Sequence, residues 1–290
     1  MGAPTTIVIN NKSDLWELYA LAPNDPDTPL TIDIRSYGFF SPMDIVLLSQ
    51  LIIQSVQKDY SVYVLGHFEG KQRYLTDIGL PDFCLANYRE PKTMQFIQSQ
   101  TAMPIKRLES STMTQYIHMA QSFIGSMCPG KYLGSLDIGI SELINNVENH
   151  SESKIGAYVF CQYYPTRKLV KFAVSDAGVG IPKKVAKFLR DNGETRINKR
   201  GCIDWAFQEK KSIKSTPRNA GLGLYNIMNF ITSNNGRLSL LSDEVCMVSI
   251  GGHNMYSRNP IKHFHGTVVE IEIVVDNLPY ADEEFGDFEI

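Results

Sequence analysis

The chain has 290 residues, of which 43% are hydrophobic and 20% are charged, so it is long enough to bury a core in one large domain or two ordinary ones. This composition excludes disordered, collagen-like and mucin-like chains. The formal net charge of −3 argues against a general attraction to nucleic acid or to anionic lipid.

Neither a membrane span nor a secretory signal is predicted. The longest apolar stretch, 45–56, is interrupted by Ser49, Gln50 and Gln54, whereas a span needs about 18 apolar residues. Residues 1–6 lack the basic start and the apolar core of a secretory signal. The five cysteines lie more than 30 residues apart without a CxxC pair, which is typical of reduced structural thiols. We therefore expect a cytoplasmic protein.

Strand and helix signals alternate over the first hundred residues, which predicts an α/β layer structure. The clearest helix follows Pro42, with Ser41 as the N-cap, Pro42 at the first helical position and Asp44 in the first turn. Its apolar residues recur every three or four positions, so one face is expected in the core. The signals fall at 6–9, 14–20, 30–34, 43–57 and 61–68.

A second and larger α/β unit follows a break in the periodicity around 88–106, where two prolines and several polar residues occur. The expected domains are 1–90 and 107–278, joined by a linker over 91–106 and followed by an acidic tail over 279–290. Helices are predicted at 109–127, 133–150 and 222–232, and strands at 155–163, 169–175, 245–250 and 267–275.

Positive charge is concentrated between Ile181 and Ala220, which contain 11 Lys or Arg against 4 Asp or Glu, a net of +7. A solvated surface loop would account for this segment. Forty residues is nevertheless longer than ordinary connections, and long loops of this kind tend to be lids or disordered.

A polar stripe runs along the predicted helix 133–150. Glu142, Asn146 and His150 are four residues apart and so project from one side, beside an apolar face. A carboxylate that can take a proton, one turn from an amide oxygen that can ligate a hard cation, suits Mg²⁺-assisted phosphoryl chemistry. A solvated stripe on an amphipathic helix would give the same pattern.

Two glycine motifs follow at strand and helix boundaries. Asp176, Gly178 and Gly180 come directly after the strand 169–175, where a carboxylate can accept from an exocyclic amine and glycines let a planar base approach. The sequence Gly-Leu-Gly-Leu at 221–224 opens a helix, and free N–H groups at a helix start favour phosphate. Each motif alone also occurs in ordinary turns.

Together, in this order and spacing, four segments resemble the N, G1, G2 and final Gly-Thr boxes of the GHKL superfamily, the ATP-binding fold of gyrase, MutL, heat-shock chaperone and histidine kinase. The resemblance spans about 109–275 and implies an α/β sandwich with a mixed sheet and helices on one face, which binds ATP and Mg²⁺. The segments are 142–150, 176–182, 221–224 and 265–273.

The resemblance assigns roles to single residues. Asn146 matches the Mg²⁺-ligating asparagine, Glu142 the catalytic base, and Asp176 the aspartate that reads adenine. This sequence departs from the family pattern at two positions: Val147 stands where alanine is common, and Asn149 stands where a basic residue is common. Contacts with the nucleotide are also implied for His150, Gly178, Gly180, Lys214, Arg218, Gly221, Leu222, Gly223, Leu224 and Thr267. The basic segment 181–220 stands where the family has its ATP lid, so the resemblance implies a basic lid there.

The layout over 113–150 resembles the anti-sigma-factor serine kinases, because the phosphoacceptor box of histidine kinases is absent. Residues 1–90 resemble, more weakly, the STAS-like domains of anti-sigma-factor antagonists. Pro42 and Met43 stand where those antagonists carry a phosphorylated serine, with only Ser41 close by. We therefore expect this domain to dock and not to accept phosphate.

Two functions are consistent with this reading. In the first, the protein is an enzyme that hydrolyses ATP, or transfers its γ-phosphoryl group to a protein serine or threonine in a signalling system, with Glu142 as the base. In the second, ATP closes a lid and controls contacts with a protein partner with little turnover. The presence of both Glu142 and Asn146 favours catalysis. The partner is not identified, and a homodimer is left open.

Overall fold

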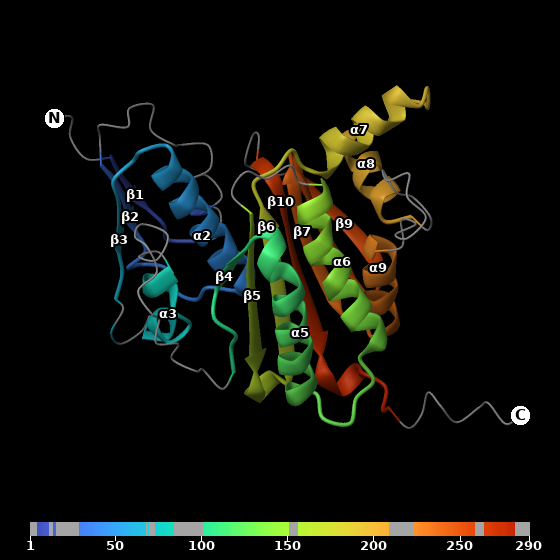
Figure 1. Cartoon of the computed structure of the whole chain (residues 1–290), viewed down its shortest axis with the longest axis horizontal. Coiled ribbons are helices and arrows are strands. Elements are labelled where there is room, and N and C mark those ends of the chain that lie inside the picture. The colour runs from blue at the N-terminus through green and yellow to red at the C-terminus, as the bar shows by residue number, and fades with distance from the viewer. Residues whose placement is uncertain are drawn as a thin grey trace, which may run out of the picture.

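The computed structural model describes residues 5–11, 14–15, 29–67, 69, 73–83, 101–150, 156–208, 223–258 and 264–281. The chain is an α/β protein with one parallel and one antiparallel sheet (Figure 1). None of the described helices is both long and apolar enough to cross a membrane.

The first sheet, called here the parallel sheet, has the order β1-β2-β3 and is parallel throughout. A parallel neighbour requires a crossover, and helix α2 (Pro42–Gln57) provides it between β2 and β3. The predicted strands at 6–9, 30–34 and 61–68 are confirmed. The bounds are β1 (Thr5–Val8), β2 (Leu30–Asp33) and β3 (Val62–Leu65), and the short helix α3 (Arg73–Asp77) follows.

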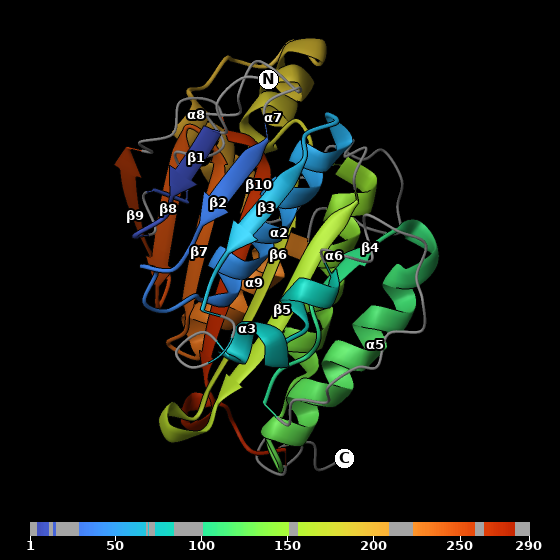
Figure 2. The ribbon, with the colours of Figure 1, turned by 90° about the vertical axis from the view of Figure 1, so that its left-hand side faces the viewer.

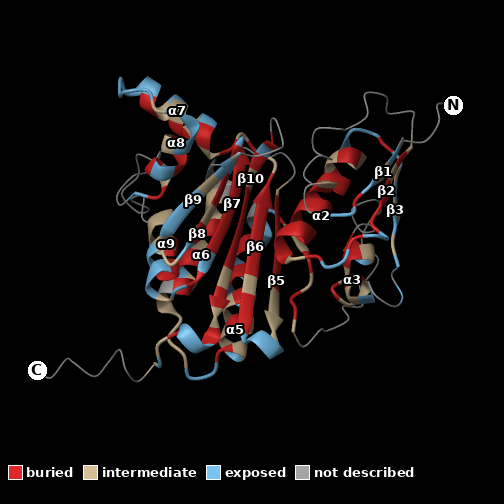
Figure 3. Cartoon of the chain, turned by 180° about the vertical axis from the view of Figure 1, so that it is seen from behind, coloured by how far each residue is buried: buried red, intermediate tan, exposed pale blue. Residues whose placement is uncertain are grey.

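Helix α2 begins as its sequence predicts. Asp44 N donates to Ser41 Oγ at 3.4 Å and Ser41 N donates to Asp44 Oδ2 at 2.8 Å, so the two residues form a capping box, with Pro42 in the first turn. The expectation of a single buried face is wrong. Ser49 and Gln50 are buried together with the apolar residues, because α2 lies between two sheets (Figure 3).

The second sheet, called here the main sheet, is antiparallel in every pair, so the prediction of a mixed sheet is wrong. Tight connections require this for three of the strands, since only Glu244 separates β7 from β8 and only Gly251 and Gly252 separate β8 from β9. In spatial order the strands are β4 (Lys106–Leu108), β5 (Ala157–Tyr164), β6 (Leu169–Asp176), β10 (Phe264–Val274), β7 (Arg237–Asp243), β8 (Val245–Ile250) and β9 (His253–Arg258).

Helices cover both faces of the main sheet. Those of the predicted unit 107–278 that pack on this sheet lie on one face, as predicted, and a helix of the N-terminal unit covers the other. On one face lie α5 (Ser110–Met127), α6 (Gly134–His150) and α9 (Gly223–Ser233), each within two residues of its predicted bounds. Gly139 lets α6 approach α9, since a Cβ there would lie 2.6 Å from Ile227 Cγ1. The opposite face is covered by α2 (Figure 2).

A single apolar cluster joins the two sheets through α2. It includes residues of the parallel sheet, most of α2, and the back of the main sheet at Tyr158, Phe160, Ala173, Leu241 and Val268. Residues 84–100, which contain most of the predicted linker, lie outside the described part of the chain. Residues 101–106 continue the edge of the main sheet, as Met103 N donates to Cys161 O at 2.9 Å.

Glu270 on β10 holds the start of α2. Its side chain is 3% exposed, and its Oε2 accepts from Met43 N at 2.8 Å, with Lys171 Nζ 3.8 Å from Oε1. A carboxylate at a helix start is favoured both by the free N–H groups and by the helix dipole. This contact joins residues 227 positions apart in the sequence.

Replacing Glu270 by leucine is expected to lower the free energy of unfolding by about 2–3 kcal/mol, because a buried donor then loses a charged acceptor. Chemical denaturation of the purified protein measures this loss. Glu272→Leu is the matched control on the same strand, since that side chain is 20% exposed and pairs with Lys171 near the surface. Equal losses in the two variants would contradict the role given to Glu270.

Candidate functional site

The site forms where β6 and β10 lie side by side, at Asp176 and Thr267, which are direct partners in the register. Successive strand residues face opposite sides, and Val174 and Val269 belong to the core beneath α5, α6 and α9. Asp176 lies two residues after Val174 and Thr267 two residues before Val269, and residues two apart on a strand face the same side. Both therefore face the side of the main sheet that carries α6 and α9.

Asp176 is a buried carboxylate, 5% exposed, that accepts from Gly178 N at 2.7 Å. Burial raises its pKa to about 7, although hydrogen bonds from the Gly178 and Thr267 backbones and the charge of Lys184 act in the opposite direction. The predicted adenine-reading residue is therefore desolvated and titrates near neutrality. Lys184, near the start of the next helix, is not among the predicted contact residues, because its position beside Asp176 depends on the turn into that helix.

Two glycines let the main chain pack closely next to Asp176. Gly180 has φ +79°, and a Cβ there would lie 3.0 Å from Ser242 Oγ. Gly266 has φ +112°, and a Cβ there would lie 1.9 Å from the carbonyl oxygen of Asp176. Gly266 therefore has no room for a side chain, and at Gly180 a side chain would require a strained φ and small shifts of its neighbours.

Ser242 ties the loop after Asp176 to β10. Its Oγ accepts from Ile181 N at 2.9 Å, donates to Gly266 O at 3.0 Å and lies 2.9 Å from Thr267 Oγ1. Ser242 had no sequence signal, because it lies on β7, a strand that was not predicted. Its role arises only when β7 and β10 pair.

Helix α6 places two further predicted residues beside the sheet. Glu142 and Asn146 are both half-buried, one turn apart, while the neighbouring Leu143 and Ile144 point into the core. The helix packs on β6, the strand that ends in Asp176. His150 is the last residue of α6, and its side chain lies outside the described part.

The predicted phosphate-binding turn is described only in part. Helix α9 begins at Gly223, and Leu224 is half-buried and packs against the core beneath α6. The other predicted residues of this group, Lys214, Arg218, Gly221 and Leu222, lie outside the described residues. Their positions in the site stay predictions.

The first part of the predicted lid is helical and does not form a loop. It contains α7 (Ile181–Asp191) and α8 (Lys199–Ala206), which share a small apolar cluster of Val185, Leu189, Cys202 and Trp205. Pro182 starts α7, and Asn198 caps α8 by accepting from Gly201 N at 2.8 Å. The three- and four-residue spacing of these apolar side chains is the sequence signal that predicted helices elsewhere.

The α7–α8 hairpin is attached to the main sheet. Lys199 Nζ lies 3.1 Å from Oδ2 of the buried Asp243 and 3.1 Å from Glu244 Oε1, and Tyr256 OH donates to Asp204. The hairpin extends from the end of the sheet at which β6 stops (Figure 1). Of the basic residues of α7, Lys184 lies close enough to Asp176 for its charge to lower the pKa of that carboxyl.

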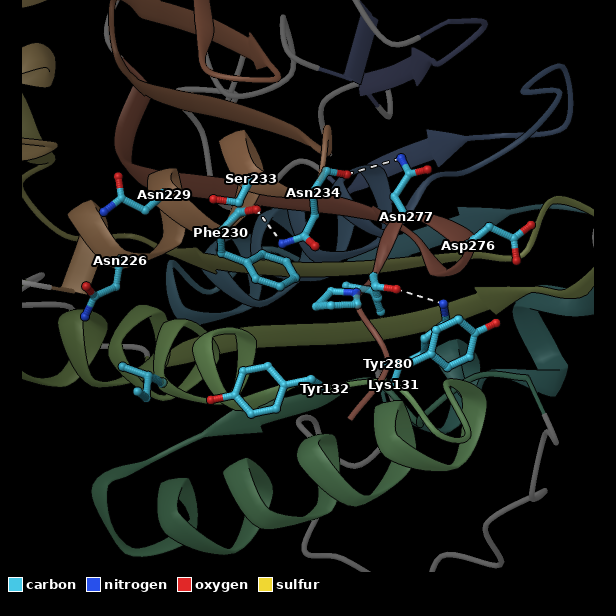
Figure 4. Close-up of a pocket in the computed structure, with 13 residues that line it drawn as sticks. Lys131, Tyr132, Asn226, Asn229, Phe230, Ser233, Asn234, Asp276, Asn277 and Tyr280 are labelled. Carbon is cyan, nitrogen blue, oxygen red and sulfur yellow. Dashed lines mark hydrogen bonds between the residues drawn. The ribbon is translucent and has the colours of Figure 1, made fainter. Parts of the chain in front are cut away.

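A pocket of about 690 Å³ lies at the other end of the main sheet, between the start of α6, helix α9 and the segment after β10 (Figure 4). Its charged groups already have partners. Lys131 Nζ donates to Leu278 O at 2.7 Å and lies 3.7 Å from the ring centroid of Tyr280, while Asp276 pairs with Lys168 at 3.0 Å. None of the predicted site residues lines this pocket.

Among the described residues, no group of three or more His, Cys, Asp or Glu side chains is placed to hold a metal ion. A cation near Asp176 would therefore need ligands of other kinds, such as amide oxygens or oxygens of a bound molecule. The sequence matches no model of a known protein family, and a search of curated proteins gives no match. A functional interpretation thus depends on the geometry around Asp176.

Proposed function

We propose that the chain is a Mg²⁺-ATP-binding protein of the GHKL type, with the nucleotide between α6, the loop after Asp176 and the start of α9. The observation that carries this proposal is the buried carboxylate of Asp176, which has the backbone of a glycine, Gly178, directly beside it at 2.7 Å. A desolvated acceptor beside bare backbone suits a planar base with an exocyclic amine.

The carboxylate has capacity for a further donor. An ionised carboxylate offers about four lone-pair sites, and the Gly178 and Thr267 backbones use two of them. The amine of adenine would take a remaining site. Thr267, hydrogen-bonded to Ser242 and fixed beside Asp176, would line the same side of the base.

The phosphates and the metal ion would lie toward α6 and α9. Mg²⁺ usually keeps several waters and binds one or two protein groups together with substrate phosphates, so Asn146 with the triphosphate is a sufficient ligand set. The N-terminus of α9 favours phosphate, and the lid would add positive charge. Glu142, one turn from Asn146, would take a proton from water or from a protein hydroxyl.

The acceptor of a phosphoryl group, if transfer occurs, would belong to another molecule. Ser41 caps α2, which packs on the face of the main sheet opposite α6. The N-terminal unit thus lies behind the site, which fits the role of a docking unit. The alternative function, an ATP-gated binding module with little turnover, would use the attached α7–α8 hairpin as the moving contact.

Turnover distinguishes the two functions. Glu142→Gln is expected to lower the rate of ADP release from Mg²⁺-ATP by at least 100-fold, because general base catalysis is lost, while the affinity for a non-hydrolysable ATP analogue stays within about twofold. A coupled ADP assay and calorimetry measure these quantities. The same low ADP release from wild type and variant would favour the binding module, and the absence of nucleotide binding by the wild type would refute the proposed function.

A further inference from the structure

Helix α2 contacts the main sheet directly behind the candidate nucleotide site. Ser175, the residue before Asp176, faces the opposite side of the sheet, and its Oγ lies 3.5 Å from the carbonyl oxygen of Val46 on α2. Figure 2 shows α2 between the parallel sheet and β6. The strand end that carries Asp176 on its front is therefore bound to α2 on its back.

A second contact joins α2 to β10, the strand that carries Thr267. Glu270 lies three residues further along β10, on the face toward α2, and accepts from Met43 N at 2.8 Å. Because β6 and β10 pair residue by residue from Thr267 to Val274, α2 holds both strands of the site. Displacement of α2 would remove one contact from β6 next to Asp176 and one from β10 three residues after Thr267.

The interface between α2 and the main sheet contains a polar group that it does not satisfy. Gln50 is 0% exposed, and within the described part of the chain neither Oε1 nor Nε2 makes a hydrogen bond. It lies one turn after Val46 and two turns after Met43, so it shares their side of α2, which faces the sheet. A buried carboxamide without partners disfavours the docked arrangement.

We propose that α2 positions the Asp176 site from behind, so that docking of the N-terminal unit and binding of nucleotide strengthen each other. This inference rests on the proposed function. A ligand that holds the ends of β6 and β10 in place also holds the groups that bind α2. Conversely, tighter docking of α2 fixes the two strands before the ligand arrives, and thermodynamic linkage makes the two effects equal. The unsatisfied Gln50 keeps docking weak enough to respond.

The test replaces Gln50 by methionine, which has a similar length and no polar hydrogen-bonding group. Gln54→Met is the matched control, one turn further along α2 and half-buried. Calorimetry with a non-hydrolysable ATP analogue and Mg²⁺ is expected to show about fivefold tighter binding for Gln50→Met, within the usual range of coupling between sites, and less than a twofold change for Gln54→Met. Hydrogen exchange of the α2 amides should slow when the analogue binds to the wild type.

Unchanged nucleotide affinity in a folded Gln50→Met variant would overturn the coupling. The same holds if the hydrogen-exchange rate of the α2 amides in the wild type does not change when the analogue binds. Glu270→Gln serves as the second variant, because it weakens the anchor of α2 from the face opposite the nucleotide. The affinity of the Glu270→Gln variant for the ATP analogue should fall about fivefold. An unchanged affinity would count against the proposal. A wild type that binds no nucleotide overturns the proposed function as well, so the two failures are distinguishable.

Discussion

Asp176→Asn is expected to weaken binding of an ATP analogue by roughly 5- to 150-fold at pH 8. Gly178 N donates to Oδ1 of Asp176, so the oxygen of an asparagine amide would keep that bond and its NH₂ group would face the ligand. Two donors, the amide and the adenine amine, would then oppose each other. A buried donor without an acceptor costs about 1–3 kcal/mol, a factor of roughly 5 to 150 in affinity.

The pH dependence provides an independent check. Burial raises the pKa of Asp176 to about 7, so the carboxylate acts fully as an acceptor only above that pH. Wild-type affinity should therefore rise between pH 6 and pH 8, beyond any change due to the phosphates themselves, while Asp176→Asn should lack this increment. Calorimetry in matched buffers measures both. Parallel pH profiles for wild type and variant would exclude Asp176 as the reader of the base.

The same substitution is expected to stabilise the free protein at pH 8. A carboxyl group with a raised pKa contributes stability that is present below its ordinary value near 3.8 and is lost as the pH rises through about 7. At pH 8 the wild type carries this cost, on the order of 2–4 kcal/mol, and the asparagine variant does not. Urea denaturation of the nucleotide-free proteins at pH 5 and pH 8 should show the difference growing with pH.

Gly266→Ala is expected to have the largest effect on folding, a loss of at least 3 kcal/mol or failure to fold. The added Cβ would lie 1.9 Å from the carbonyl oxygen of Asp176, which belongs to the backbone of the adjacent strand and cannot rotate away. The φ angle of +112° adds strain for any residue with a side chain. Thermal and urea denaturation give the loss directly.

Gly193→Ala is the control for this prediction. Gly193 also has a positive φ, +69°, yet no atom lies within 4 Å of the position of its Cβ. Its loss should therefore be limited to backbone strain, about 1–2 kcal/mol. Similar losses at the two glycines would show that strain alone, and not the approach of β10 to β6, determines the cost at Gly266.

Local signals in the sequence predicted the elements better than their arrangement. The bounds of α2 and α5 follow from caps and from apolar spacing, which depend on neighbours a few residues away. Strand β8 has its predicted bounds, Val245–Ile250, while β7 and β9 beside it were not predicted. The position of α2 between two sheets depends on contacts such as Met43 with Glu270, 227 residues apart, which no periodicity encodes.

In the candidate site, too, local motifs were predicted and long-range partners were not. Asp176, Gly178 and Gly180 lie in one short motif, so the sequence pointed to them directly. Ser242 and Lys184 join them only through strand pairing and the turn into α7. Because such partners are set by the register of β6, β10 and β7, they become visible only when the sheet is assembled.

The burial of α2 on both sides has a consequence for synthesis of the protein on the ribosome. The helix ends at Gln57, whereas β5, the first strand of the main sheet that covers its second side, begins at Ala157. At about 5–20 residues per second, translation of the intervening residues takes on the order of ten seconds. During that interval one apolar side of α2 has no sheet to cover it, so the nascent N-terminal region exposes an apolar surface that a chaperone can bind.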